Sequence, residues 1–112
     1  MKYWIPVVLM LAAVAHSAEV TGAKAELLQA RTALEAGRFK EALQYTARVQ
    51  VFYYRDAEAM AAALYVEAAV DRKTGDSRAT VSALTELKTL YPDSMWCRKA
   101  IEEFETTEQG SQ

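Results

Sequence analysis

Apolar and small residues recur every three or four positions along most of the chain, which is the period of an amphipathic helix. The pattern predicts helices over residues 23–36, 39–53, 57–73, 77–90 and 95–105. Their inward positions share this spacing and are Leu27, Ala30, Ala33 and Leu34, then Phe39, Ala42, Leu43, Thr46, Val49 and Tyr53, then Val81, Leu84 and Leu87. The sequence therefore predicts an all-α fold.

Glycine, proline and capping residues separate the helices. Gly37 and Gly75 each follow a helical stripe, where a residue without Cβ takes the left-handed conformation at low cost. Asp76 or Ser77 is expected to cap the fourth helix, and Asp93 or Ser94 the fifth. Pro92 ends the fourth helix, because the residue before a proline disfavours the α conformation.

The third predicted helix differs from the others in its alanine content. Its alanines are Ala57, Ala59, Ala61, Ala62, Ala63, Ala68 and Ala69. Alanine has the highest helix propensity and lets neighbouring backbones approach closely. We expect this helix to lie in the middle of the fold and to be contacted on more than one face.

One segment of the chain occurs twice, at residues 36–43 (AGRFKEAL) and, more weakly, at residues 74–81 (TGDSRATV). Gly37 and Gly75 lie 38 positions apart (75 − 37), a period typical of helical repeat arrays. Such arrays generally present a surface to another protein.

The two segments resemble the tetratricopeptide repeat. Gly37 matches the turn glycine of that family, Phe39 the aromatic after the turn and Ala42 the small residue where the helices cross. In the second copy Ser77 and Thr80 stand at the last two positions. The resemblance implies two antiparallel helix hairpins and a C-terminal capping helix, that is, a short right-handed α-solenoid over residues 19–105 that binds protein or peptide.

The junction Tyr91-Pro92-Asp93-Ser94 is similar to the repeat junction of bacterial cell-envelope tetratricopeptide proteins. This likeness implies an exported adaptor that works by protein–protein contact in the envelope. A subunit stable mainly within a homo- or hetero-oligomeric envelope complex is the alternative, because about three repeats are usually needed to bury a continuous core.

The resemblance also implies a concave groove lined by the first helix of each hairpin. Its groove positions fall on Lys24, Leu27, Arg31, Leu34 and Glu35, and on Ala62, Tyr65, Ala69, Arg72 and Lys73. The four cations outnumber Glu35, so the groove is expected to be locally basic and to suit a protein or an extended, acidic peptide. The opposing interpretation is that these cations only form a solvated face.

Aromatic residues offer a second candidate contact surface. Phe52, Tyr53, Tyr54 and Tyr65 are expected to pack between the hairpins, and any that stay exposed would be anchors for a partner. Trp96 is expected to cover the core, and Glu102, Glu103 and Glu105 to form a solvated acidic edge.

The N-terminal residues 1–18 have the layout of a cleaved secretory signal. Lys2 supplies the positive charge, an apolar run extends from Tyr3 to Ala15, and small residues precede Ala18. The run is shorter than the ~20 residues of a membrane span, so we expect no stable anchor after cleavage. The predicted location is periplasmic or secreted, with an uncleaved inner-membrane anchor as the alternative. Residues 106–112 are polar and are expected to be disordered.

Charge and rare residues narrow the classes of function. The formal net charge is −2, and −3 once Lys2 is removed, which disfavours nucleic acid as a partner. The single histidine, His16, lies in the signal segment, and the single cysteine, Cys97, is expected to be a small buried residue. Histidine is the commonest general base and metal ligand, and none lies outside the signal segment. We therefore predict that the protein has no catalytic residue, metal site or cofactor and is not an enzyme.

Overall fold

The computed structural model describes residues 22–105, and within this range the regular structure is entirely helical. The predicted signal peptide at residues 1–18 and the predicted disordered tail at residues 106–112 lie outside the described residues. Among residues 22–105, none of the helices combines the length and the apolar character needed to cross a bilayer.

The helices follow the predicted order and begin and end within one residue of the predicted positions, except at the C-terminal end. The first helix covers residues 22–35. It is followed by α2 (Phe39–Phe52), α3 (Ala57–Lys73), α4 (Ser77–Leu90) and α5 (Met95–Ala100). The fifth predicted helix is α-helical only as far as Ala100 and continues as the π-helix η1 (Ile101–Glu105).

Both glycine turns have the geometry expected from the sequence. Gly37 has φ +79° and Gly75 has φ +81°. Arg38 N donates to Ala33 O at 2.8 Å and Gly37 N to Leu34 O at 3.1 Å. The same two bonds recur around Gly75, so each turn is a Schellman motif that satisfies the last carbonyls of the preceding helix.

Side-chain caps begin three of the helices, α3, α4 and α5. Asp56 Oδ1 accepts from Ala59 N at 3.1 Å, and Asp76 Oδ1 accepts from Ala79 N at 3.0 Å. Ser94 Oγ accepts from Trp96 N at 3.1 Å. Each cap satisfies a backbone donor that has no partner inside its own helix.

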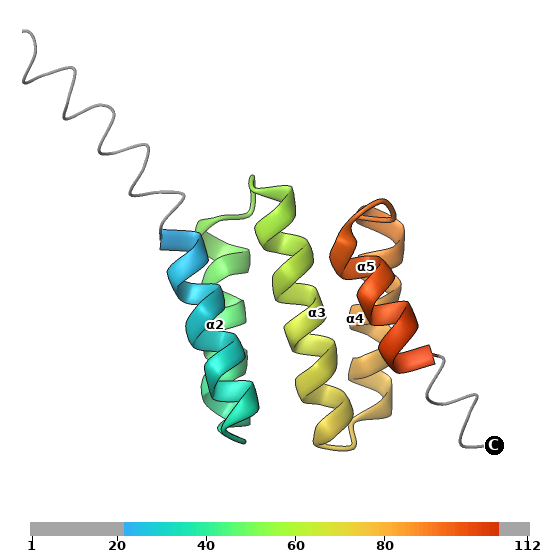
Figure 1. The fold of residues 1–112 in the computed structure, drawn as a ribbon, viewed down its shortest axis with the longest axis horizontal. Helices are drawn as coiled ribbons and strands as arrows, with labels where there is room; N and C mark the ends of the chain where they lie inside the picture. Colours follow the sequence, from blue (N-terminus) through green and yellow to red (C-terminus); the bar gives the residue numbers. More distant parts are fainter. Residues whose placement is uncertain (1–21, 106–112) are drawn as a thin grey trace, which may run out of the picture.

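Helix α3 lies in the middle of the molecule, as its alanine content predicts. Figure 1 shows the first helix and α2 on one side of it, and α4 and α5 on the other. Ala61, Ala63, Val66, Ala68 and Val70 are all 0% exposed. Because the side chains of α3 are small, helices can approach it from both sides.

The inner face of α4 differs from the prediction at one position. Leu84 and Leu87 are buried as expected, but Val81 is 62% exposed and Thr80 is buried in its place. Thr80 Oγ1 donates to Asp76 O at 2.8 Å, which satisfies the hydroxyl inside the core. Neighbouring helical residues point about 100° apart, so the burial of Thr80 turns Val81 towards solvent.

Candidate binding groove

The first helix, α3 and the α5–η1 segment form one face of the molecule. In Figure 1 the first helix and α5 lie in front of α2 and α4, with α3 between them. This face contains two hollows, one near the N-terminal end of α3 and one near its C-terminal end. We call them the upper and the lower hollow, after their positions in Figure 1, and together they form the groove.

The upper hollow has a volume of ≈ 350 Å³. Its floor and walls are mainly apolar and carry two cations and two carboxylates. The lining residues are Ala23, Lys24, Leu27, Leu28, Arg31, Asp56, Glu58, Ala59, Ala62 and Trp96. The Trp96 indole Nε1 is enclosed and has no hydrogen-bond acceptor among residues 22–105, so packing holds the ring.

The lower hollow has a volume of ≈ 500 Å³. It combines aromatic and aliphatic groups with two cations and one carboxylate. The lining residues are Leu34, Tyr65, Ala69, Arg72, Lys73, Glu103 and Phe104.

The groove positions selected from the sequence lie close to where the repeat register places them. The upper hollow contains Lys24, Leu27, Arg31 and Ala62, and the lower hollow contains Leu34, Tyr65, Ala69, Arg72 and Lys73. Glu35 is exposed and lines neither hollow. The structure therefore brings residues from two distant segments of the chain to one face.

Sequence reasoning missed the contribution of the last helical segment. Trp96, Glu103 and Phe104 line the hollows, although none of them was assigned to the groove. Glu103 and Phe104 follow Trp96 by seven and eight positions, a spacing that places all three on one face of a helix. This spacing could have indicated that the three residues belong to one surface. The prediction that Trp96 covers the core is confirmed, because its ring packs against the main core cluster.

Three aromatic rings form a continuous cluster that joins the two hollows, with Trp96 in the upper one and Tyr65 and Phe104 in the lower one. The Tyr65 ring centroid lies 5.3 Å from that of Trp96 and 5.6 Å from that of Phe104. We call Tyr65, Trp96 and Phe104 the ring cluster. Such separations are typical of favourable aromatic pairs.

Cations lie over the faces of all three rings. Arg31 Cζ is 5.7 Å from the Trp96 centroid, and Arg72 Cζ is 5.3 Å from the Phe104 centroid. Lys99 Nζ is 5.3 Å from the Tyr65 centroid and 5.6 Å from that of Trp96. The ring quadrupole attracts these charges and so restricts where the cations lie.

Glu103 is exposed, as predicted, and is also tied to the ring cluster. Tyr65 Oη donates to Glu103 Oε2 at 2.5 Å, and Lys99 Nζ lies 4.0 Å from Glu103 Oε1. Burial raises the pKa of the Tyr65 hydroxyl, and the hydrogen bond to Glu103 raises this pKa further. Glu105 pairs with Lys88, so the predicted acidic edge anchors η1 to the rest of the fold.

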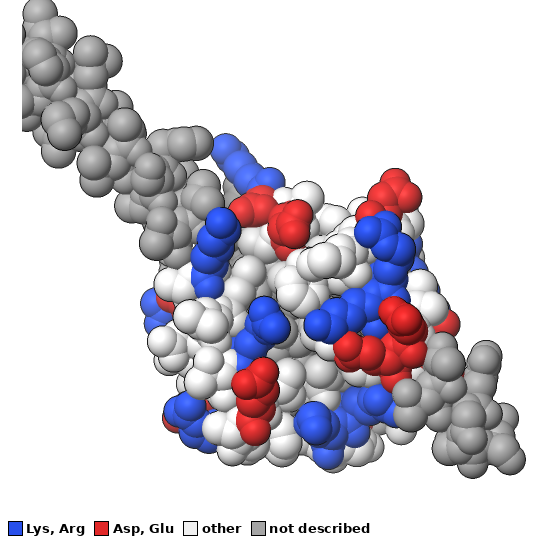
Figure 2. Space-filling model, viewed as in Figure 1, with Lys and Arg blue, Asp and Glu red and all other residues white. Residues whose placement is uncertain are grey.

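The charge of the groove is more mixed than the sequence suggested. Asp56 and Glu58 balance the two cations of the upper hollow, whereas the lower hollow has two cations and only Glu103. Figure 2 shows acidic and basic side chains interspersed around a hollowed, uncharged strip. The expected basic character therefore holds for the lower hollow alone.

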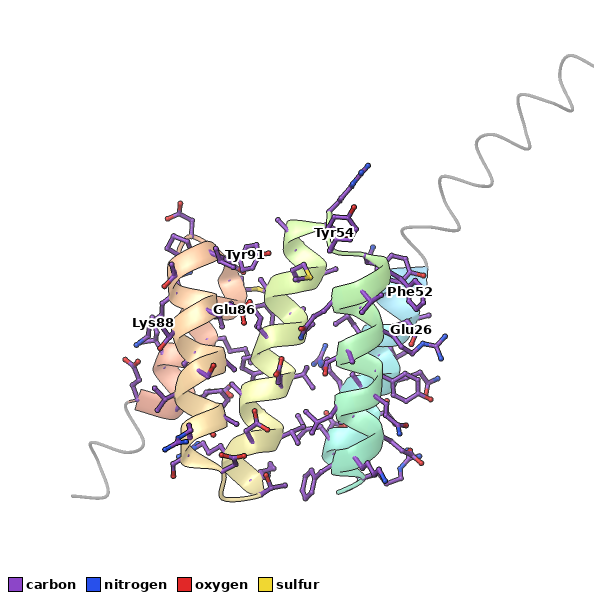
Figure 3. All side chains as sticks on the ribbon, turned by 180° about the vertical axis from the view of Figure 1, so that it is seen from behind. Glu26, Phe52, Tyr54, Glu86, Lys88 and Tyr91 are labelled. Carbon is purple, nitrogen blue, oxygen red and sulfur yellow. The ribbon has the colours of Figure 1, made fainter. Side chains whose placement is uncertain are left out.

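The aromatic residues expected between the hairpins are not grouped there. Phe52 is 67% and Tyr54 58% exposed, and both lie at the upper end of α2 in the view from behind (Figure 3). Tyr53 packs partly against the small cluster around Ala23, while Tyr65 belongs to the groove. The predicted packing role is wrong for Phe52 and Tyr54: Phe52 is the exposed last residue of α2, and Tyr54 lies beyond the end of that helix.

The Cys97 thiol and the Asp71 carboxyl group are both buried in the fold. Cys97 is 2% exposed, which confirms the expected buried thiol. Within residues 22–105 there is no group of three or more His, Cys, Asp or Glu side chains arranged to hold a metal ion. Asp71 is 8% exposed, and its burial, followed by the charges of Glu67 and Asp76, raises the pKa of its carboxyl group.

No protein-family model matches this chain, and no curated protein or solved structure matches it either.

Proposed function

We propose that this protein is an exported adaptor of two tetratricopeptide-like hairpins and a capping helix, and that its groove binds an extended segment of another protein. One observation carries this proposal. Nine of the ten positions that the repeat register assigns to a groove line the two hollows. Their lining combines apolar and charged side chains, which suits side chains of both kinds on a bound segment.

The packing of the helices supports the repeat assignment. Ala30 and Ala42, at the small positions of the first repeat, are both 0% exposed. Gly37 and Gly75 make the same Schellman turn in the two copies. Helix α5 contacts both α3 and α4, as a capping helix does at the end of a stack.

The place of action follows from the N-terminal pattern of Lys2, the apolar run and the small residues. In this proposal the mature protein works in the bacterial periplasm or outside the cell, and an uncleaved N-terminal anchor is the alternative. N-terminal sequencing of protein recovered from the envelope fraction distinguishes these two locations.

Site-specific photocrosslinking in the producing cells tests the groove function. A photoreactive residue at Leu27 or Leu34 is expected to capture a discrete partner, because these half-buried side chains line the two hollows. The same residue at Gln44, exposed on α2, is the matched control. Capture from Gln44 or Tyr54, and none from Leu27 or Leu34, would contradict the groove function.

Exposed apolar side chains favour the second candidate, a subunit that is stable mainly inside an oligomeric complex. Several lie at the ends of α2 and α4 and at the start of α5, namely Val51 (65% exposed), Phe52 (67%), Leu90 (56%) and Met95 (53%). Light scattering on the purified mature protein separates the two candidates. The adaptor is expected to have a monomer mass, and the subunit a multiple of it.

A further inference from the structure

Two cations of the groove, Arg31 of the upper hollow and Arg72 of the lower hollow, are each held over an aromatic ring. The Arg31 Cζ atom lies 5.7 Å from the Trp96 ring centroid, and the Arg72 Cζ atom lies 5.3 Å from the Phe104 ring centroid. The ion pairs within residues 22–105 involve other cations, so neither guanidinium is paired with a carboxylate in this range. A guanidinium stacked on a ring keeps its charge, and the N–H groups at its edge stay available as donors.

Besides Arg72, the lower hollow has a second cation and an aliphatic surface. Lys73 adds a further positive charge to the lower hollow, while Leu34 and Ala69 give it an aliphatic surface. Among residues 22–105, the carboxylate that lines this hollow is that of Glu103, which already accepts a hydrogen bond from the Tyr65 hydroxyl and lies near Lys99. Within this range, positive charge therefore exceeds negative charge around the ring cluster.

We propose that Arg31 and Arg72 bind acidic side chains of an extended peptide whose neighbouring apolar side chain lies on Leu34 and Ala69. This inference rests on the proposed groove function and names the class of partner. The chemistry that would recognise the partner is bidentate hydrogen bonding from a pre-oriented guanidinium to a carboxylate. Arg31 lines the upper hollow and Arg72 the lower one, so the two arginines would contact acidic side chains at two points along the peptide.

Arginine is needed here for its shape as well as for its charge. A planar guanidinium stacks on a ring and presents two parallel donors to a carboxylate, whereas a lysine ammonium is a point charge. Replacement of both arginines by lysine therefore keeps the positive charge but removes the bidentate geometry. Replacement by glutamine removes both.

A binding assay with two synthetic peptides tests the inference on the full chain. The probe is a fluorescein-labelled peptide of about twelve residues that alternates Glu and Leu, and the matched probe alternates Gln and Leu. The wild-type protein is expected to bind the Glu probe about tenfold more tightly or better, the ratio typical of charged hydrogen bonds. Added salt should reduce this ratio.

Variants then assign the preference to the two arginines. R31Q/R72Q is expected to bind both probes equally, and R31K/R72K to keep an intermediate preference. K40Q/R78Q is the matched control, because it removes the same charge from exposed positions of α2 and α4 outside the hollows. Circular dichroism on all the variants verifies that their helical content is unchanged.

Three results would overturn the inference. They are equal binding of the two probes by the wild-type protein, an equal loss of preference in R31Q/R72Q and K40Q/R78Q, and binding of inorganic polyphosphate without binding of the Glu probe. Photocrosslinking at Leu34 distinguishes a failure of the acidic specificity from a failure of the proposed groove function. If R31Q/R72Q still captures the native partner from that position, the groove function stands and the acidic specificity is wrong.

Discussion

The two hairpins reach the same backbone geometry with different side chains. In the first, Phe39 follows the turn and Ala42, at the position expected for the helix crossing, is 0% exposed. In the second, Thr80 stands at the corresponding position, is 5% exposed and donates a hydrogen bond from its hydroxyl to the backbone. Alanine and threonine can therefore both be buried at this position, because each is small and the threonine hydroxyl has an acceptor.

The helix starts after the two turns also differ. Arg38 begins α2 without a side-chain cap, whereas Asp76 begins α4 with a carboxylate that accepts from Ala79 N. The first hairpin compensates with the half-buried Phe39 ring, which packs against the core. Aromatic packing after one turn and a cap after the other therefore stabilise equivalent positions.

The largest effect is expected at the first crossing. Ala42→Leu adds three carbons at a site with no exposed surface and should lower the free energy of unfolding by about 1–3 kcal/mol. Ala47→Leu, at an exposed position of the same helix, is the matched control. Thermal melting measures both, and an unchanged melting temperature for Ala42→Leu would contradict the tight crossing.

The two glycines are expected to respond alike. A Cβ at either position meets no atom within 4 Å, so the cost of Gly37→Val or Gly75→Val comes from the positive φ alone. The left-handed conformation costs roughly 1–2 kcal/mol for a residue with a Cβ. Urea denaturation should show similar losses for both, and smaller ones for Gly37→Asn and Gly75→Asn, because asparagine tolerates this conformation. A loss confined to one glycine would show that the two turns are not equivalent.

Substitutions at the N-cap positions of α2 and α4 should have different effects on the stability of the two hairpins. Asp76→Ala removes a cap and should cost ~1 kcal/mol of stability. Arg38→Asp introduces a capping side chain where the structure has none and should stabilise the first hairpin by a smaller amount. Hydrogen exchange at the first turns of α2 and α4 measures each effect locally. Faster exchange at Arg38→Asp would contradict the view that this helix start lacks only a cap.

The smallest effect concerns Asp71, whose pKa is raised by burial and then by the charges of Glu67 and Asp76. Because the pKa is higher in the folded than in the unfolded protein, protonated Asp71 favours the fold below the ordinary pKa of 3.8, and this contribution is lost as pH rises through the folded pKa. Asp71→Asn should therefore raise the melting temperature at pH 7 relative to the parent. This advantage should disappear near pH 3, and a constant difference between the two pH values would contradict the raised pKa.

Most of the fold could be predicted because its signals are local. Gly37, Gly75 and Pro92 mark helix ends through backbone conformation alone, and the alanines of α3 indicate burial on several faces. The exposure of Val81 could not be predicted in the same way. Thr80 and Val81 are neighbours on one helix, and only contact with α3 decides which of them faces the core.

The candidate groove also combines features that could be predicted from the sequence with features that depend on helix packing. The helices, their turns and the side of the first helix and α3 on which Leu27, Leu34 and Tyr65 lie could be predicted, because periodicity is a property of each helix. The packing of the helices against one another brings Trp96 and Phe104 to Tyr65. It also places Arg31 and Arg72 over these rings and brings Asp56, Glu58 and Glu103 into the groove, where they reduce its positive charge. These contacts join residues far apart in the chain, and they depend on the distance and rotation between helices, which side-chain packing sets only when the whole core assembles.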